Sequence, residues 1–202
     1  ELSLEALRSM QTRLANFEDE ATFVKYLDAA KIVARIEDVW PDHAAVLNGT
    51  YRLTPRGRLA MSLPGLHSVC NAAEIRKAVA AVCPDVRSFD DYLGACRTLC
   101  EGYHRYGAVA FKDQAAYYRH LAYTRPERAA AEAVFNRLLA NPTETATPET
   151  GRWILDDFLF HELLKNARDL ALPVQIHTGL LAGLRGDMRP VNAAHLTPLF
   201  PM

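Results

Sequence analysis

Two side chains able to do chemistry end short apolar segments of this sequence. His177 closes the segment 174–177, and Lys112 directly follows the segment 108–111. An imidazole at the end of a strand can bind a metal ion or carry a proton, and an amine in the same place can bind an anion. Because the carboxyl ends of parallel strands meet at one edge of a sheet, we take Lys112 and His177 as candidate catalytic residues.

Three further residues are candidate substrate contacts. Arg35 lies in the apolar segment 32–36, and alternation along a strand places it on the same side as Glu37. Arg189 and His195 follow in a loop rich in glycine and proline, which could fold over a site as a lid. Cations beside such a site favour a substrate that carries a carboxylate.

Each candidate also has a structural alternative. His177 can hydrogen-bond a backbone carbonyl, Lys112 can extend along a strand edge into water, and Arg35 can form a surface pair. His195 also fits the start of a short helix. The other histidines share no ligand spacing, and the sequence has no zinc-protease, Walker, dinucleotide-binding or nucleophile-elbow motif.

The elements that must position these residues alternate between strands and helices. Strands are predicted at 32–36, 108–111 and 174–177, and helices at 72–82, 88–106, 127–140 and 148–171. This order is typical of an α/β protein with a parallel sheet and helical crossovers. Glycine and proline are so dense in 48–70 that we expect an irregular insertion loop there.

Composition narrows the classes of partner. The 202 residues include 23 basic and 24 acidic side chains, a formal net charge of −1. This balance favours a small-molecule substrate over nucleic acid or a membrane surface, and it leaves a homo-oligomer open. We find no apolar run close to the ~20 residues of a membrane span. Four cysteines without a Cys-x-x-Cys pair indicate free thiols and a cytoplasmic protein.

The segments around the two candidate catalytic residues resemble the amidohydrolase superfamily, in particular its amidohydrolase-2 branch. They are Leu172-Pro-Val-Gln-Ile-His-Thr-Gly179, Asn192-Ala-Ala-His-Leu-Thr-Pro-Leu-Phe200 and Tyr106-Gly-Ala-Val-Ala-Phe-Lys112. The resemblance implies part of a (β/α)8 TIM barrel with metal at the carboxyl ends of its strands. It places His177 as the metal ligand of the fifth strand and Lys112 at the end of the fourth.

The resemblance also implies a reaction. A metal-dependent hydrolase of this type uses a metal-activated water to attack a C–N or C–O bond of a small substrate. Zinc is the first choice of metal, with manganese and iron as alternatives. Decarboxylation and uronate isomerisation are alternative reactions on the same fold, and a degenerate, non-catalytic relative that binds a ligand or partner is a further alternative.

The match to that superfamily is incomplete. No His-x-His pair occurs in the sequence, and no eighth-strand Asp follows His177. The sequence therefore supplies at most two of the metal ligands that the resemblance implies, whereas a catalytic zinc has about three protein ligands. We therefore expect residues 1–202 to be a single, partial barrel domain with about three strands, from the middle of a longer enzyme.

Overall fold

The computed structural model describes residues 3–13, 19–39, 42–179 and 187–200. The chain divides into two compact units, which are described separately. The first is Glu1–Glu37 with Arg52–Arg58, and the second is Asp38–Tyr51 with Leu59–Met202. The expectation of a single, partial barrel domain over 1–202 remains a prediction.

Two helices open the first unit, α1 (Leu4–Arg13) and α2 (Glu20–Ala29). The side chain of Asp19 starts α2 by accepting a hydrogen bond from the N–H of Thr22 at 2.8 Å. A carboxylate at this position satisfies an unpaired N–H and offsets the positive end of the helix dipole.

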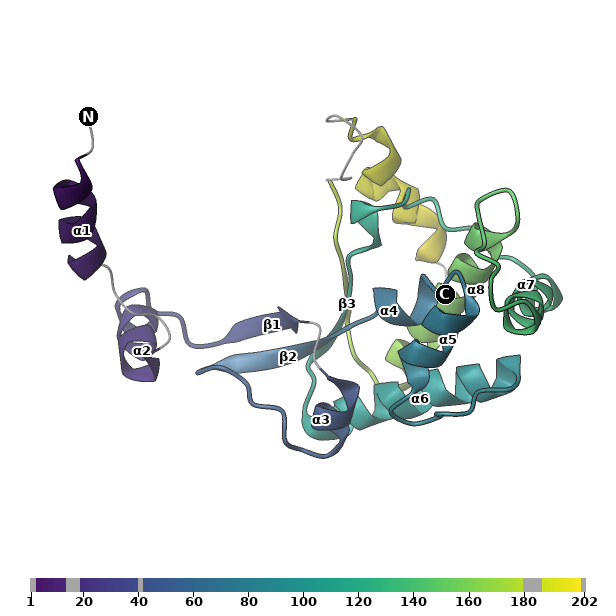
Figure 1. Cartoon of the computed structure of the whole chain (residues 1–202), viewed down its shortest axis with the longest axis horizontal. Coiled ribbons are helices and arrows are strands. Elements are labelled where there is room, and N and C mark those ends of the chain that lie inside the picture. The colour runs from purple at the N-terminus through teal and green to yellow at the C-terminus, as the bar shows by residue number, and fades with distance from the viewer. Residues whose placement is uncertain (1–2, 14–18, 40–41, 180–186, 201–202) are drawn as a thin grey trace. The chain divides into compact units, whose positions relative to one another are not determined.

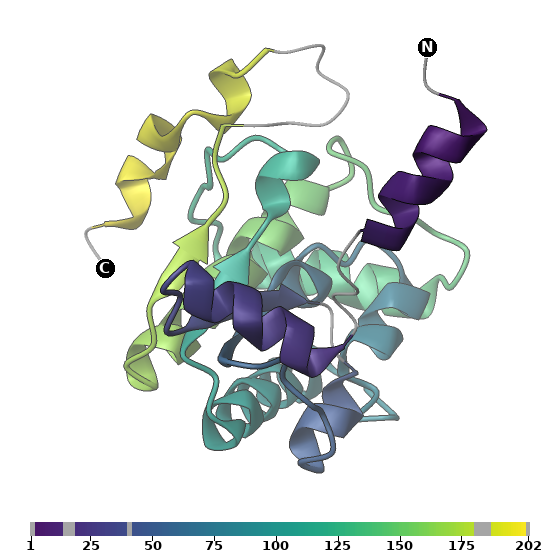
Figure 2. The same ribbon diagram turned by 90° about the vertical axis from the view of Figure 1, so that its left-hand side faces the viewer.

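Four strands form one sheet in the order β1 (Arg35–Val39), β2 (Gly57–Ser62), β3 (Ala110–Asp113) and β4 (Val174–Ile176). The last three are parallel, with Met61 opposite Phe111 and Phe111 opposite Val174. Figure 2 shows β3 and β4 side by side. Helical crossovers connect these parallel strands, which confirms the predicted α/β class.

Two predictions about the sheet are wrong. Residues 48–70 are not an irregular loop, because they contain β2 and the short helix α4 (Pro64–His67). Gly57 begins β2 and Pro64 begins α4, while Leu59, Ala60 and Met61 within β2 are fully buried. Strand bounds also differ, because the first strand is Arg35–Val39 rather than 32–36 and β3 is Ala110–Asp113 rather than 108–111, so Lys112 lies within β3.

Four helices of the second unit lie close to their predicted ranges. They are α5 (Ala72–Val79), α6 (Phe89–Tyr106), α7 (Arg128–Ala140) and α8 (Arg152–Asp169), whereas α3 (His43–Leu47) was not predicted. Ser88 and Asp91 form a capping box at the start of α6. The α8 helix begins later than residue 148, because Gly151, in the left-handed region at φ 98°, directly precedes Arg152.

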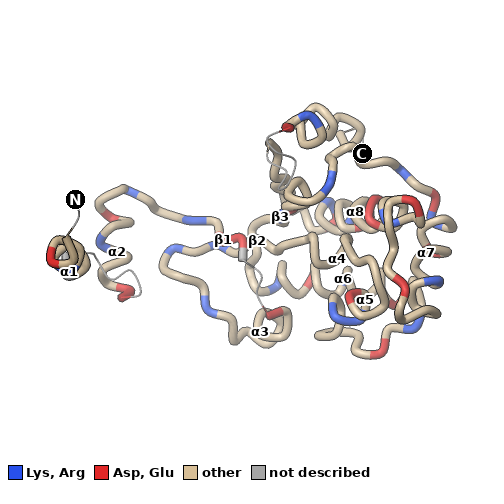
Figure 3. Tube along the Cα trace, turned by 45° about the horizontal axis from the view of Figure 1, so that its top comes forward, with Lys and Arg blue, Asp and Glu red and all other residues tan. Residues whose placement is uncertain are grey.

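Helices cover one face of the parallel strands in the second unit (Figure 1). Leu164 and Ala167 of α8 line an apolar cavity together with Val174 and Ile176 of β4. Ser62, Lys112 and Gln175 are register partners on the opposite face. Both acidic and basic positions occur along α7 and α8 (Figure 3). Among the described residues, no helix is both long and apolar enough to cross a membrane.

Candidate functional site

Polar side chains gather at the carboxyl ends of the parallel strands, on the face that α8 does not cover. Lys112 is the register partner of Gln175, and His177 follows two residues later on the same side of the chain. The backbone N–H of His177 donates to the carbonyl of Asp113 at 2.8 Å, which ties the end of β4 to the end of β3. The two candidate catalytic residues therefore lie at neighbouring strand ends.

The imidazole of His177 has an unusual environment. Its ring stacks on that of Tyr117, with centroids 4.3 Å apart and planes 20° from parallel. Its Nε2 atom is buried and has no hydrogen-bond partner among the described residues. Buried polar atoms are nearly always paired in folded proteins, so a partner from beyond the described residues is expected here.

A metal ion fits this environment only in part. Within the described residues, no three His, Cys, Asp or Glu side chains come together in a way that could hold a metal. The unpaired Nε2 of His177 suits one ligand of a shared ion, whereas a catalytic zinc has about three protein ligands. The described part of the chain therefore does not form a complete metal centre.

Arg35 belongs to the first unit and is already paired there. Its Nη2 atom donates to Glu37 Oε1 at 2.9 Å, and its guanidinium lies 4.8 Å from the centre of the Phe23 ring. Arg35 and Glu37 thus share one side of β1, as alternation predicts. The two side chains form an ion pair, although Glu37 is buried rather than at the surface, and substrate contact by Arg35 stays a prediction.

Arg189 and His195 lie together in the segment 187–199, which holds the 3-10 helices η2 (Arg189–Val191) and η3 (Ala193–Leu199). Arg189 pairs with Asp187 at 2.8 Å and its side chain is 90% exposed, while Nε2 of His195 contacts the Arg189 carbonyl at 2.9 Å. Within the described residues, no hydrogen bond or ion pair joins either one to the candidate catalytic pair. Their roles as substrate contacts stay predictions.

A buried imidazolium lies on the helix side of β3. Nε2 of His67 is 3.2 Å from Asp113 Oδ1, and its Nδ1 is 2.6 Å from Asp156 Oδ1. All three side chains are fully buried. Burial lowers the pKa of His67, but the charge of Asp156 and the hydrogen bonds to both carboxylates outweigh it and raise the pKa to about 9. His67 is therefore protonated at neutral pH.

A guanidinium completes this arrangement. Arg119 is 2.7 Å from Asp156 and 2.5 Å from Asp157, and its guanidinium lies 4.2 Å from the centre of the Tyr123 ring and 4.7 Å from that of Trp153. Burial lowers the pKa of Arg119, and the charges of Asp156 and Asp157, among other contacts, together raise it above its ordinary value. We name the following residues the buried charge cluster: His67, Asp113, Arg119, Asp156 and Asp157.

The buried charge cluster was missed in the sequence, although one signal points to it. Asp156 and Asp157 stand three and four residues after Trp153, and Phe160 follows at the next turn. They therefore occupy the apolar stripe of an amphipathic helix. Carboxylates at such positions are buried, and buried carboxylates need cationic partners.

A cavity of about 440 Å³ opens next to the cluster, lined by residues that include Asp42, His43, Ser68 and Lys77. The Ser68 hydroxyl donates to Asp156 Oδ2 at 3.1 Å, so it connects the cavity lining to the cluster. Burial lowers the pKa of His43, which keeps this ring neutral at neutral pH.

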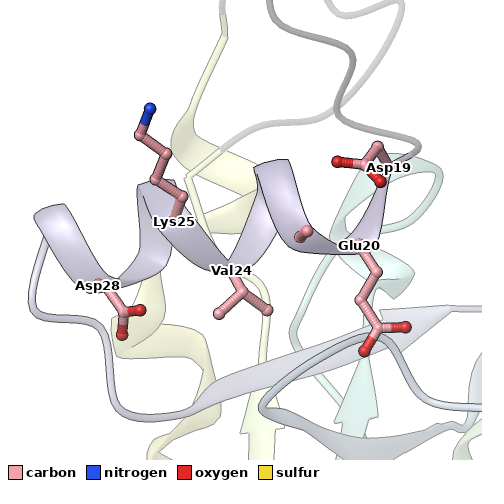
Figure 4. Close-up of a pocket in the computed structure, with 6 residues that line it drawn as sticks. Asp19, Glu20, Val24, Lys25 and Asp28 are labelled. Atoms are coloured by element: carbon pink, nitrogen blue, oxygen red, sulfur yellow. The ribbon is translucent and has the colours of Figure 1, made fainter.

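The first unit has a cavity of about 690 Å³ along α2, lined by Asp19, Glu20, Lys25 and Asp28 among others. Figure 4 shows Lys25 pointing away from Glu20 and Asp28. These charges come from one helix and point in different directions. They do not converge on a common ligand.

No family model matches the sequence, and no curated protein matches it. One similar solved structure is a protein from Lactobacillus casei ATCC 334 described as a metal-dependent hydrolase, with a TM-score of 0.52 and 17% identity. Glucuronate isomerase from Caulobacter crescentus is another, with a TM-score of 0.54 and 22% identity. The matches cover 71% and 76% of this chain.

These matches cover only 34% and 32% of the two structures, so the chain spans about a third of their length. At such low identity the likeness shows the fold alone. The fold is helix-rich α/β with parallel strands, consistent with part of a TIM barrel.

Proposed function

We propose that this chain is part of a metal-dependent hydrolase of the amidohydrolase type that acts on a small, carboxylate-bearing substrate. One observation carries the proposal: His177 lies at the carboxyl end of β4, next to the strand end that carries Lys112, and its buried Nε2 has no hydrogen-bond partner among the described residues. In (β/α)8 barrels, chemistry takes place at this end of the strands. The likeness to a metal-dependent hydrolase supports the same class.

His177 would hold one position of a divalent metal ion, with zinc as the first choice and manganese or iron as alternatives. When bound, such an ion polarises a carbonyl and lowers the pKa of a water molecule. The remaining ligands would come from outside the described residues. Lys112 would bind the substrate carboxylate and orient it, with Arg35, Arg189 and His195 as further proposed substrate contacts.

The metal content of the whole protein tests the role of His177. Elemental analysis after dialysis should find close to one equivalent of zinc, manganese or iron, and His177→Gln should lose it. The matched control is His104→Gln, which changes an exposed histidine in the last turn of α6 and should keep the metal. Equal metal content in both variants would refute the proposal.

Steady-state kinetics test the role of Lys112. Lys112→Met keeps the length of the side chain and removes its charge, so KM for an anionic substrate should rise about 10- to 100-fold, the value of a charge-assisted hydrogen bond. Lys165→Met, on the exposed side of α8, serves as the control and should leave KM unchanged. An unchanged KM for Lys112→Met contradicts the assignment.

The likeness to glucuronate isomerase supports a second candidate, isomerisation of a uronate on the same fold. Product mass separates the reactions, because hydrolysis adds one water, isomerisation leaves the mass unchanged and decarboxylation removes carbon dioxide. Metal binding without turnover of any such substrate would instead support a non-catalytic binding relative.

A further inference from the structure

Tyr117 lies flat against the imidazole of His177. The two ring centroids are 4.3 Å apart and their planes differ by 20°. Tyr117 ends η1 (Ala115–Tyr117), a single 3-10 turn that directly follows β3. An offset-stacked ring limits the rotation of the imidazole about its Cβ–Cγ bond. The plane of that ring decides the direction in which Nε2 points.

Asp113 fixes both partners of this stack. Its Oδ1 atom accepts the N–H of Ala115 at 3.0 Å, which anchors the turn that carries Tyr117. Its backbone carbonyl accepts the N–H of His177 at 2.8 Å. The Asp113 carboxylate is itself held by His67 at 3.2 Å and by the hydroxyl of Tyr123 at 2.9 Å. Asp113 therefore connects the buried charge cluster to the opposite face of the sheet. We call that face, which carries Lys112 and His177 at the carboxyl ends of the strands, the strand-end face.

Burial alone does not explain why the Tyr117 ring lies where it does. Tyr117 is 41% exposed, so a large part of its surface contributes nothing to holding the ring in place. Tyr118 is equally exposed, yet its hydroxyl contacts Ser68 at 2.7 Å. Two adjacent tyrosines thus have different partners, and Tyr118 is a matched control for Tyr117.

We propose that Tyr117 is a positioning residue that sets the plane of the His177 imidazole, anchored by Asp113 in the buried charge cluster. The inference rests on the proposed function, in which Nε2 of His177 is a metal ligand. A preoriented ligand loses less rotational freedom when it binds, so the stack strengthens metal affinity without touching the metal.

Spectra of protein labelled with ¹³C in histidine test the stack in the absence of metal. His177→Gln identifies the signals of His177. The ring current of Tyr117 should shift the His177 ring protons upfield. Tyr117→Ala should abolish this shift, Tyr117→Phe should keep it and Tyr118→Ala should leave it unchanged. Identical His177 signals in wild type and Tyr117→Ala overturn the proposal.

A titration with Mn²⁺ tests the consequence for binding, because the paramagnetic ion broadens signals of its ligands. Tyr117→Ala should weaken Mn²⁺ affinity about 2- to 10-fold, the factor that an aromatic pair provides, and Tyr117→Phe should restore it. Loss of the shift with unchanged affinity overturns the positioning role. Wild-type protein that keeps the shift but shows no broadening at His177 refutes the proposed function, and the positioning role fails with it.

Discussion

The buried charge cluster and the strand-end face around His177 lie on opposite sides of β3, and they differ in how the ring nitrogens of their histidine are paired. Each member of the cluster contacts an oppositely charged partner, as His67 does with Asp113 and Asp156. His177, by contrast, has a buried Nε2 without a partner among the described residues. Paired buried charges hold elements in place, whereas an unpaired polar atom marks where a ligand is expected.

The largest expected effect comes from breaking the cluster at Asp156. Asp156→Asn keeps the volume of the side chain but leaves His67 and Arg119 without their shared carboxylate. Removing one partner of a buried pair costs about 3–5 kcal/mol of the free energy of unfolding. Urea denaturation measures this loss.

Asp169→Asn is the control for that experiment. It lies on the same helix, where Asp169 forms an exposed ion pair with Arg168. Exposed pairs contribute about 0–1 kcal/mol, so this variant should unfold almost as the wild type does. Equal losses for the two aspartates would contradict the distinction between paired buried charge and surface charge.

Stability should also depend on pH through His67. Its pKa rises on folding from 6.5 to about 9, so the folded state binds its proton more tightly. The resulting stabilisation is fully present below pH 6.5 and is lost as pH rises through about 9. At ~1.4 kcal/mol for each pKa unit, the loss is about 3 kcal/mol.

Urea denaturation at a series of pH values measures this decline. His67→Gln should remove it, while His104→Gln should retain it because His104 is exposed on α6. A free energy of unfolding in the wild type that stays constant between neutral pH and pH 9 would show that His67 is not a buried imidazolium.

A smaller effect is expected at Ser68, which lies at the border of the cluster. Ser68→Ala removes hydrogen bonds to Asp156 and Tyr118 and should cost about 1 kcal/mol. Thr98→Ala is the control, because among the described residues its hydroxyl donates to the carbonyl of Gly94, one turn earlier in its own helix, and its loss should change stability little. A larger loss for Thr98→Ala would exclude a connecting role for Ser68.

The smallest effect on stability should come from the strand-end face itself. His177→Gln removes the stack on Tyr117 but breaks no side-chain hydrogen bond with a described residue. Its free energy of unfolding should fall by less than about 1 kcal/mol in thermal or urea denaturation. A loss as large as that of Asp156→Asn would place His177 among the residues that hold the fold together.

The sequence was sufficient for the four longest helices of the second unit and, to within two residues, for the positions of β3 and β4. Periodicity and caps locate α6 well, because Ser88 and Asp91 satisfy its first N–H groups through contacts three residues apart. The β2 strand was not predicted, because the glycine and proline residues close to its ends made the whole of 48–70 resemble an irregular loop. Its short apolar run between Gly57 and Pro64 was the signal that was available.

The pairing within the candidate site could not be predicted in the same way. Which ring lies on His177 depends on a single 3-10 turn after β3, and no spacing rule fixes such a turn. The partners of His67 lie far away in sequence, so only the folded structure shows that two carboxylates enclose this histidine.

The separation of those partners also has a consequence for the order in which the chain folds. His67 and Asp156 are 89 residues apart, and Arg119 and Asp157 are 38 apart. Closing such long loops costs chain entropy before any contact compensates for it. We expect α6 and α8 to form early through local contacts, and the cluster to assemble after the rate-limiting barrier. Substitutions in the buried charge cluster should then mainly increase the rate of unfolding and leave the rate of folding nearly unchanged. If α4 packs against the wrong helix, the charge of His67 is buried without its carboxylate partners. The buried charge cluster therefore favours the correct packing of α4 in the last step of folding.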